Sequence, residues 1–181
     1  KKKRQVFVFD NNFRGSYLNL QNIKKKFKFI RGDIRDIKTV KKAITNIDEV
    51  YHLAFINGTS NFYNKSKLVM DVGIKGTINL MDAINSNKKI KKFVYASSSE
   101  VYQEPQKFPT PEDISAKLPN TFNPRFSYAS SKILGEVLTY NYLRSDLKKI
   151  IFRPHNIYGP SMGFEHVIPE ITKKIITKSN K

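Results

Sequence analysis

Cysteine is absent from the 181-residue sequence, and histidine occurs only three times. Without thiols, neither a disulfide framework nor a thiolate metal site can form. His52, His155 and His166 lack the spacing of metal ligands, so the sequence predicts no metal centre. Long apolar runs and a recognisable signal segment are also missing, which predicts a cytoplasmic protein without membrane contact. His52 lies in an apolar segment, where a hydrogen-bonded core histidine is expected.

Acidic residues are scarce. The sequence has 33 Lys and Arg against 15 Asp and Glu, which gives a formal net charge of +18. Such an excess can mark a nucleic-acid-binding surface, so a non-catalytic basic module that binds nucleotides or nucleic acid is one hypothesis. The lysines are spread along the chain, however, and accompany no nucleic-acid motif. We therefore expect no specific nucleic-acid partner, only a weak, salt-dependent attraction to polyanions. A basic face also favours diphosphate substrates.

Segments rich in β-branched and aromatic residues alternate with segments of helical periodicity, a pattern typical of a parallel sheet flanked by helices. The predicted strands are Val6–Phe9, Phe27–Ile30, Val50–Leu53, Phe93–Ala96 and Ile150–Phe152. The predicted helices are Ile37–Thr45, Lys67–Asn85, Ser127–Leu143 and His166–Ile176. The expected fold class is α/β, with a doubly wound, Rossmann-like parallel sheet.

Polar residues follow the predicted strands, at the sheet edge where such folds bind ligands. They are Asp10, Gly32-Asp33, Ser97 to Glu100, and Arg153-Pro154-His155-Asn156, with Ala54 after the third strand. An acidic residue at such a strand tip can accept hydrogen bonds from a ribose diol and disfavours a 2′-phosphate. Asp10 therefore favours NAD over NADP. The alternative is a turn residue beside Asn11-Asn12.

Tyr128 and Lys132 are four residues apart in a predicted helix and would share one face. A nearby ammonium favours the phenolate form of tyrosine, so Lys132 is expected to lower the pKa of Tyr128. A tyrosine made acidic in this way can act as a general base near neutral pH. The alternative is a packed ring beside a solvated charge.

Seven sequence pieces occur in the order of one family. They are Phe9-Asp10-Asn11, Gly32-Asp33-Ile34-Arg35-Asp36, Tyr51-His52-Leu53-Ala54, Gly76-Thr77-Ile78-Asn79-Leu80, Ser97-Ser98-Ser99-Glu100-Val101-Tyr102, Tyr128 with Lys132, and Arg153-Pro154-His155-Asn156-Ile157-Tyr158-Gly159-Pro160. On these residues the chain resembles the extended short-chain dehydrogenases/reductases, in the branch of NAD-dependent nucleotide-sugar epimerases, dehydratases and decarboxylases.

That family opens with a strand and a Gly-x-x-Gly-x-x-Gly turn, which holds the cofactor pyrophosphate. This sequence has no such turn. In the strand order 3-2-1-4-5-6, the first strand would lie between the strands that end at Asp10 and Leu53. We therefore expect an internal fragment: residues 1–181 as a partial NAD-binding domain, with a substrate-binding region starting after about residue 160. Such a piece is expected to be poorly stable and to bind NAD weakly.

The resemblance implies roles for individual residues. Tyr128 would be the base, Lys132 would lower its pKa and bind the nicotinamide ribose, and Ser98 would hydrogen-bond the reacting oxygen unless it only caps the strand end. The implied cofactor-binding residues are Asp10, Asn11, Asp33, Ile34, Leu53, Ala54, Tyr128, Lys132 and Pro154. The implied substrate-binding residues are Ser98, Ser99, Tyr128 and Asn156. The implied substrate is a nucleotide-diphosphate sugar.

The residues after Ser98 bear on the reaction. In the 4,6-dehydratase pattern an Asp-Glu pair follows the catalytic Thr, whereas this chain has Ser99 and Glu100. Ser-Glu is similar to UDP-glucuronate decarboxylases and GDP-mannose dehydratases, in which Glu100 would assist chemistry at a 4-keto intermediate. The run from His155 to Pro160 is similar to some sugar epimerases. The resemblance implies a 4-epimerase-like enzyme, with a nucleotide-sugar decarboxylase or 4,6-dehydratase as the alternative.

Other positions depart from the family or imply further features. Gly73 stands where the family often has an asparagine, and Gln103 replaces a glycine. The segment 104–124 contains five prolines and is expected to be an irregular loop over the sugar site, or else a mere connector. Family members commonly pair through the helices placed here at Lys67–Asn85 and Ser127–Leu143, so the resemblance implies a homodimer.

Overall fold

Two parallel sheets form the scaffold of the computed structural model, which describes residues 4–159, 162 and 167–179. β1 (Val6–Asp10) pairs with β2 (Phe27–Arg31), with Val8 opposite Phe29. β3 (Glu49–His52), β4 (Lys92–Ala96) and β5 (Lys148–Phe152) form the second sheet, with Tyr51, Val94 and Ile150 in register. The predicted parallel α/β architecture is confirmed.

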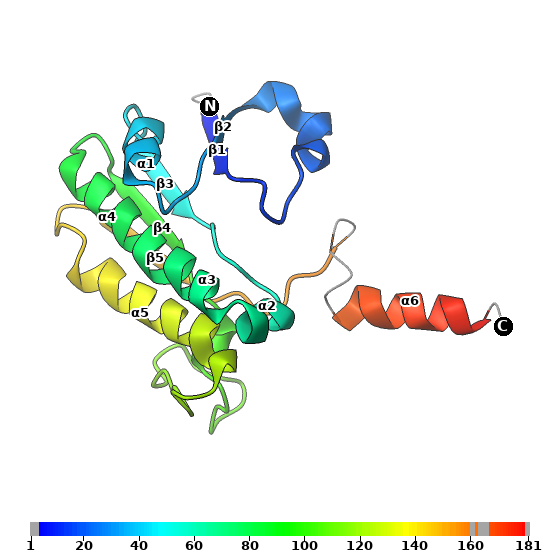
Figure 1. The fold of residues 1–181 in the computed structure, drawn as a ribbon. Coiled ribbons are helices and arrows are strands. Elements are labelled where there is room, and N and C mark those ends of the chain that lie inside the picture. Colours follow the sequence, from blue (N-terminus) through cyan, green and yellow to red (C-terminus); the bar gives the residue numbers. More distant parts are fainter. Residues whose placement is uncertain (1–3, 160–161, 163–166, 180–181) are drawn as a thin grey trace.

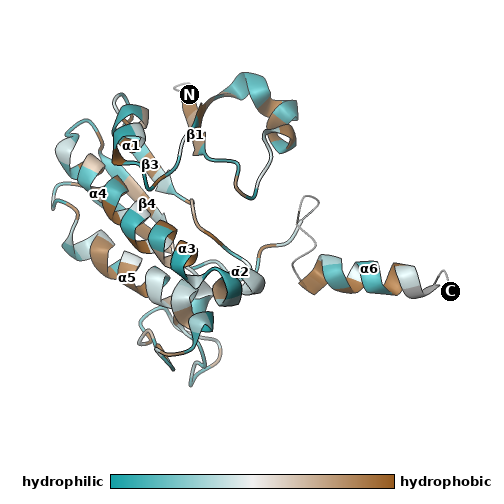
Figure 2. Cartoon of the chain, in the orientation of Figure 1, coloured by the Kyte–Doolittle hydropathy of each residue, from teal (hydrophilic) through white to brown (hydrophobic). Residues whose placement is uncertain are grey.

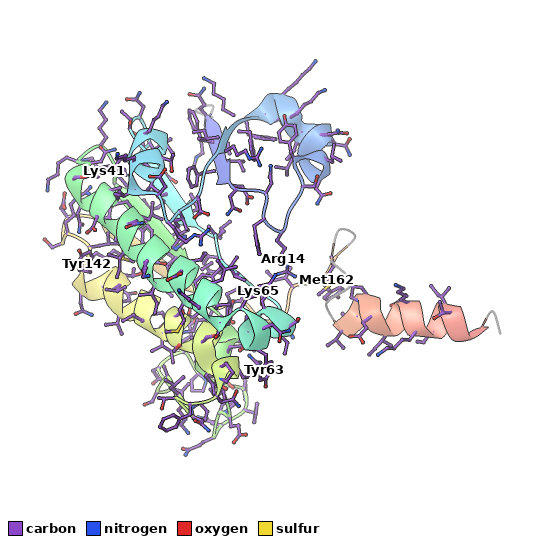
Figure 3. The ribbon with its side chains drawn as sticks, in the orientation of Figure 1. Arg14, Lys41, Tyr63, Lys65, Tyr142 and Met162 are labelled. Atoms are coloured by element: carbon purple, nitrogen blue, oxygen red, sulfur yellow. The ribbon has the colours of Figure 1, made fainter. Side chains whose placement is uncertain are left out.

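The sheet is divided at the position where the sequence predicts a missing strand. Within the described ranges, β1 pairs only with β2, and β3 pairs only with β4 (Figure 1). Both β1 and β3 therefore keep one edge without a strand partner. Lys65 nevertheless reaches the segment after β1, because its Nζ lies 5.5 Å from the ring centroid of Phe13. Figure 3 labels Lys65 and Arg14 in this region.

Three consecutive helical segments replace the single helix predicted over Lys67–Asn85. They are α3 (Ser66–Met70), a π-helical turn (Asp71–Gly76) and α4 (Thr77–Ser86). The remaining helices are α1 (Ile37–Ala43), α2 (Thr59–Asn64), α5 (Ser127–Asn141) and α6 (Val167–Ser179). The described part of the predicted His166–Ile176 helix lies in α6, whereas His166 and Pro160 are outside the described residues.

Two helical segments of more than three residues lie outside the predicted helices. The first is the 3-10 segment Tyr17–Lys26, which connects β1 to β2 and is capped by Ser16 through a hydrogen bond from the Leu18 N–H of 3.2 Å. Its side chains are mainly polar, so no apolar periodicity indicated a helix. The second is α2, a single short helix whose buried residue is Phe62. The predicted irregularity of the segment before Pro124 is confirmed, since it contains only turns and bends.

The hydrophobic core lies between the β3–β5 sheet and the helices on one of its faces, where α3 and α4 follow each other in one line and α5 runs beside them (Figure 1). Figure 2 shows hydrophobic and hydrophilic residues alternating along these helices, as expected for amphipathic segments. Fully buried side chains include Phe62, Met81, Ile84, Phe93 and Tyr95. By contrast, the hydrophobic residues of α6 are more than half exposed.

His52 is a core residue, as predicted. Its side chain is 3 % exposed and its Nε2 lies 2.9 Å from Thr77 Oγ1. Burial lowers the pKa of His52 to about 3, and the nearby positive charge of Lys132 acts in the same direction. The imidazole is therefore neutral at physiological pH and fastens β3 to α4.

Candidate active site

Helix α5 places Tyr128 and Lys132 on the face that is buried against the sheet. The helix follows a 3-10 turn (Pro124–Phe126), whose capping residue Asn123 accepts a 2.9 Å hydrogen bond from the Arg125 N–H. Tyr128 is 8 % exposed and Lys132 is 3 % exposed. The spacing of four residues thus brings both groups to one side of the helix, beside the carboxyl end of β4.

Tyr128 is held by two aromatic rings. Phe62 stacks on it at a centroid distance of 4.9 Å, and Phe55 meets it edge-on at 5.2 Å. Burial raises the pKa of Tyr128, although a hydrogen bond with the side chain of Ser98 lowers it in part. The expectation that this phenol has a depressed pKa is therefore wrong for this structure. Desolvation of the charged form outweighs the hydrogen bond, so Tyr128 is a neutral phenol.

Lys132 donates a 2.6 Å hydrogen bond to the carbonyl oxygen of Ala96, the last residue of β4. Its Nζ lies 3.7 Å from the ring centroid of Phe55 and 5.5 Å from that of Tyr128. Burial lowers the pKa of Lys132 to about 7. The amine thus lies near the Tyr128 ring, and its hydrogen bond goes to the backbone at the end of β4.

The segment after β4 supplies the serines of the site. Ser98 is buried, and its Oγ accepts a 3.2 Å hydrogen bond from the Glu100 N–H, which caps a short 3-10 turn (Ser99–Val101). The Ser99 N–H donates to the carbonyl oxygen of Pro154 at 2.9 Å. The structure therefore brings Ser98, Ser99 and Pro154 together with Tyr128. Asn156, two residues beyond Pro154 in the segment after β5, is exposed.

Glu100 forms an ion pair that the sequence reasoning missed. Arg125 donates to both carboxylate oxygens of Glu100, at 2.8 and 3.1 Å. The same guanidinium lies 5.2 Å from the ring centroid of Phe62, on which Tyr128 stacks. The two partners are 25 residues apart, so no local spacing could have indicated the pair. The position of Arg125 three residues before Tyr128 was the only available signal.

A second ion pair stabilises this region at the end of β5. Arg153 binds both carboxylate oxygens of Glu136 at 2.8 and 2.7 Å, and it also donates to the Tyr102 hydroxyl at 3.0 Å. A further hydrogen bond of 2.9 Å reaches the carbonyl oxygen of Glu112 in the proline-rich loop. Arg153 therefore joins the end of β5 to α5 and to the loop.

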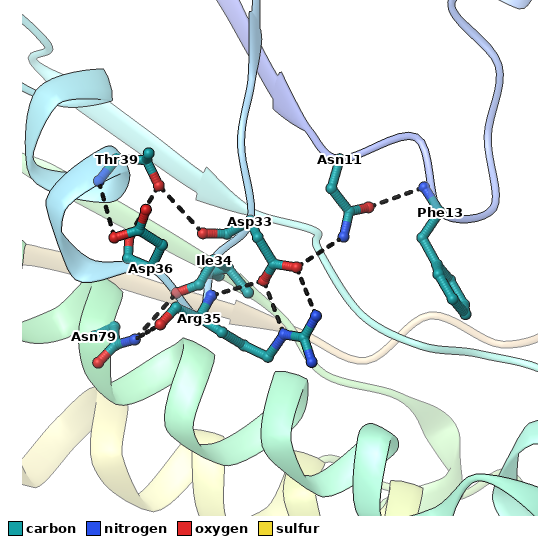
Figure 4. A network of polar contacts seen from close by, with 8 residues as sticks. All are labelled: Asn11, Phe13, Asp33, Ile34, Arg35, Asp36, Thr39 and Asn79. Atoms are coloured by element: carbon teal, nitrogen blue, oxygen red, sulfur yellow. Dashed lines mark hydrogen bonds and ion pairs between the residues drawn. The ribbon is translucent and has the colours of Figure 1, made fainter.

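Asp33 is the centre of a second polar network, at the carboxyl ends of β1 and β2 (Figure 4). Arg35 donates to its two oxygens at 3.0 and 2.7 Å, and the Asn11 amide donates at 3.1 Å. These hydrogen bonds, led by that from Arg35, hold the pKa of Asp33 well below its usual range. Ile34 is buried, and the Asn79 amide donates to its carbonyl oxygen at 3.3 Å.

The remaining candidates are less enclosed. Asp10 is exposed and accepts a 2.6 Å hydrogen bond from the Asn12 N–H. In this structure it is therefore a turn residue, which was the alternative interpretation. Leu53 is 64 % exposed and lies one residue beyond β3, whereas Ala54 packs against the core. The Asp33 network and the Tyr128 cluster thus form two separate groups at the carboxyl edges of the two sheets.

The donor set of these two groups fits a dinucleotide. An ammonium carries three donors, and the hydrogen bond of Lys132 to Ala96 uses one of them, which leaves donors for ribose hydroxyls. Asp33 and Asn11 add acceptors and donors at the β1–β2 edge. The described residues contain no cluster of His, Cys, Asp and Glu suited to a metal ion. In the same part of the chain, no helix has the length and apolarity needed to span a membrane.

Comparison with known proteins agrees with this geometry. The sequence pattern of the NAD dependent epimerase/dehydratase family matches residues 1–180. The chain belongs to this family. It is 32 % identical over 160 residues to a UDP-N-acetyl-alpha-D-glucosaminuronate decarboxylase of Bacillus cytotoxicus, which covers 88 % of the chain and 49 % of that protein. A dTDP-D-glucose 4,6-dehydratase of Dictyostelium discoideum is 30 % identical, with 97 % and 43 % covered.

Solved structures of the family share the fold. The dTDP-glucose 4,6-dehydratase DesIV of Streptomyces venezuelae, solved with NAD bound, gives a TM-score of 0.86 at 22 % identity, and the match covers 97 % of this chain and 54 % of that chain. A UDP-glucuronic acid 4-epimerase of Bacillus cereus in complex with NAD gives 0.78 at 27 % identity, with 96 % and 55 % covered. The chain spans about half the length of the curated relatives that it matches first.

Proposed function

We propose that this chain is part of a 4-epimerase-like enzyme that uses NAD to oxidise the C4 hydroxyl of a nucleotide-diphosphate sugar transiently. The observation that carries the proposal is the convergence of the Ser98 hydroxyl, the Tyr128 phenol and the Lys132 amine at the end of β4. Membership in a family of NAD-dependent epimerases and dehydratases supports it.

Named residues would hold the cofactor. When bound, NAD would supply the redox chemistry, as acceptor and donor of a hydride at the sugar carbon. Lys132 would bind the nicotinamide ribose through its remaining donors. The adenosine side would be held by Asp10, Asn11, Asp33 and Ile34, and the nicotinamide side by Leu53, Ala54 and Pro154.

Tyr128 transfers the proton of the sugar hydroxyl. Held by the Phe62 and Phe55 rings, the neutral phenol is ready to give its proton to a ketosugar oxygen, with the Ser98 hydroxyl as the second hydrogen-bond partner. The opposite direction requires the phenolate, which a positive charge stabilises. The Lys132 ammonium is the cation 5.5 Å from the Tyr128 ring centroid. Because the pKa of Lys132 is about 7, this cation is only partly present near neutral pH.

The surroundings of Ser98 favour epimerisation over 4,6-elimination. Elimination needs a group that protonates the departing hydroxyl, and the position after Ser98 is Ser99 rather than an acid. Glu100 is held by two hydrogen bonds from Arg125, which it would have to break to meet a sugar. Epimerisation needs only that the ketosugar turns over within the site. In this scheme Ser99 and Asn156 contact the sugar, and the proline-rich loop covers it.

One observation favours a second candidate, a nucleotide-sugar decarboxylase. The Arg125 guanidinium lies beside the Phe62 ring that stacks on Tyr128, and a guanidinium binds carboxylates in a bidentate manner. A uronate carboxylate could replace Glu100 as its partner, and Glu100 would then be free to act at the 4-keto intermediate. The similarity to the B. cytotoxicus decarboxylase agrees with this alternative.

We further propose that the parent protein is a homodimer that pairs through the helical run from α3 to α4 and through α5, the regions predicted as Lys67–Asn85 and Ser127–Leu143. Leu134, Val137 and Tyr140 follow one another at helical spacing on α5 and are exposed. Such an apolar stripe is typical of a helix face that packs against another helix. Directly after α5, the Tyr142 hydroxyl donates a 2.6 Å hydrogen bond to Asp82 of α4 (Figure 3).

The test is turnover of UDP- and GDP-sugars by the whole gene product that contains this chain, followed by NMR. A C4 epimer is the expected product, whereas a 4-keto-6-deoxy sugar or a pentose would indicate the dehydratase or the decarboxylase. Tyr128→Phe removes the hydroxyl but keeps the packed ring, so we expect turnover to fall by about 10²–10⁴-fold. Turnover unchanged in this variant would rule out the assigned residue.

A further inference from the structure

Phe55 is an aromatic residue at the centre of the candidate site that no motif indicated. It lies in the segment after β3, one residue beyond Ala54. Its ring centroid is 3.7 Å from Lys132 Nζ, a distance at which the face of an aromatic ring attracts an ammonium. The same ring meets Tyr128 edge-on at 5.2 Å and 82°. One side chain thus contacts both residues of the proposed Tyr-Lys pair.

Gly73 makes the room for this ring. A Cβ at Gly73 would lie 2.5 Å from Phe55 Cζ and 2.8 Å from the Cβ of Ser131, which is too close for either neighbour. The backbone of Gly73 is helical and lies in the π-helical turn, so its conformation does not require glycine. The requirement is steric: only a residue without a side chain lets Phe55 pack between this turn and α5.

We propose that Phe55, seated in the space left by Gly73, is a positioning residue that holds the Lys132 side chain against the Ala96 carbonyl and beside Tyr128. The proposal rests on the proposed function of Lys132. The ring has two opposing effects on the pKa of Lys132. Its face attracts the ammonium, which raises the pKa, and its bulk keeps water away from the amine, which lowers the pKa. Removing the aromatic face and removing the bulk of the side chain should therefore shift the pKa of Lys132 in opposite directions.

Three other titratable groups near Lys132 do not carry a charge near neutral pH. Tyr95, on β4, lies 5.2 Å away, and burial raises its pKa far above its usual range. Tyr128 has a raised pKa and His52 a lowered one, so both are neutral as well. The aromatic face and the carbonyl of Ala96 are thus the groups that meet the ammonium most closely.

Titration of Lys132 by NMR of the labelled side chain, without cofactor or substrate, tests the proposal. The signal is assigned by its loss in Lys132→Met. Phe55→Leu keeps an apolar side chain but removes the ring face, so the pKa of Lys132 should fall by roughly half to one unit. Phe55→Ala admits water, so the pKa should rise above that of the wild type. If Phe55 had a merely structural role, the two variants would not shift the pKa of Lys132 in opposite directions.

Gly73→Ala tests whether Phe55 needs the space left by Gly73, and Gly76→Ala is its matched control. Both residues lie in the π-helical turn, and a Cβ at Gly76 would meet Ile34 Cγ2 at 2.5 Å, away from Phe55. Gly73→Ala should shift the Lys132 titration, and Gly76→Ala should not. Identical titration in wild type and both Phe55 variants, or equal shifts in the two glycine variants, would overturn the proposal. Because no turnover is measured, a failure of the proposed reaction would not affect this result.

Discussion

At the scale of single residues, the site depends on burial that changes what each ionisable group can do. Lys132 is almost fully buried, and its pKa of about 7 lies far below the usual value of 10.5. Tyr128 is shifted in the opposite direction for the same reason. Burial disfavours the charged form of both groups, so the free site holds a neutral phenol and a partly neutral amine. A ligand that brings negative charge to Lys132 would favour its ammonium.

The buried amine predicts a pH-dependent stability. Between about pH 7 and 9.5 the unfolded state binds the Lys132 proton and the folded state releases it, so the free energy of unfolding should rise with pH. The rise attributable to Lys132 is on the order of 3 kcal/mol across this range. Tyr95 and Tyr128, whose raised pKa values oppose this trend, titrate only above it. Urea unfolding at several pH values measures the effect.

Lys132→Met should remove most of this pH dependence and should stabilise the protein near pH 7, because an apolar side chain replaces an amine that is costly to bury. Lys41→Met is the matched control, since Lys41 is exposed on α1 (Figure 3), and it should leave the slope unchanged. Equal slopes in the wild type and in Lys132→Met would show that Lys132 is ionised in the folded protein.

At the scale of elements, α5 is the part on which the site depends most. It carries Tyr128 and Lys132, and it approaches β4 closely enough that a Cβ at Gly135 would overlap the Tyr95 hydroxyl. Arg153 fastens the end of β5 to the same helix through Glu136. The distance between α5 and β4 therefore determines whether the Lys132 amine reaches the carbonyl of Ala96.

Gly135→Ala tests this close approach. Overpacking at a rigid contact costs about 1–3 kcal/mol, and the better helix propensity of alanine offsets about 1 kcal/mol of that cost at most. We expect a net loss of stability, measured as a lower urea midpoint. Gly15→Ala is the control, because nothing lies within 4 Å of a Cβ at Gly15. Two variants of equal stability would contradict the packing described for α5.

The elements that the sequence predicted well are those with strong local signals. All five strands are rich in β-branched and aromatic residues, and α1 and α5 begin where the sequence placed them. The Tyr17–Lys26 segment was not predicted, because this lysine-rich stretch lacks apolar periodicity. The π-helical turn lies within the predicted Lys67–Asn85 helix, and apolar periodicity does not distinguish a π-helical turn from an α-helix. The partners Glu100 with Arg125 and Glu136 with Arg153 were missed because charged pairs distant in sequence leave no local pattern.

At the scale of the whole molecule, the described chain is built from two parts of unequal burial. β4 contains three consecutive buried residues, Phe93, Val94 and Tyr95. No residue of β1 or β2 is fully buried, and these strands form a two-stranded sheet. Isolated two-stranded sheets are marginally stable in water, so the free edges of β1 and β3 weaken the β1–β2 part most.

Native-state hydrogen exchange should therefore show two levels of protection in this chain. The backbone amides of β1 and β2 are expected to exchange roughly 10²-fold faster than those of β4, because local opening of β1–β2 exposes little apolar surface. The paired residues Val8 and Phe29 report on the first sheet, and Val94 and Tyr95 on the second. Adding urea should unfold β1–β2 before the β3–β5 sheet. If all four amides instead exchanged with one common free energy of opening, the two sheets would unfold as one cooperative unit, and the unpaired edges would not limit stability.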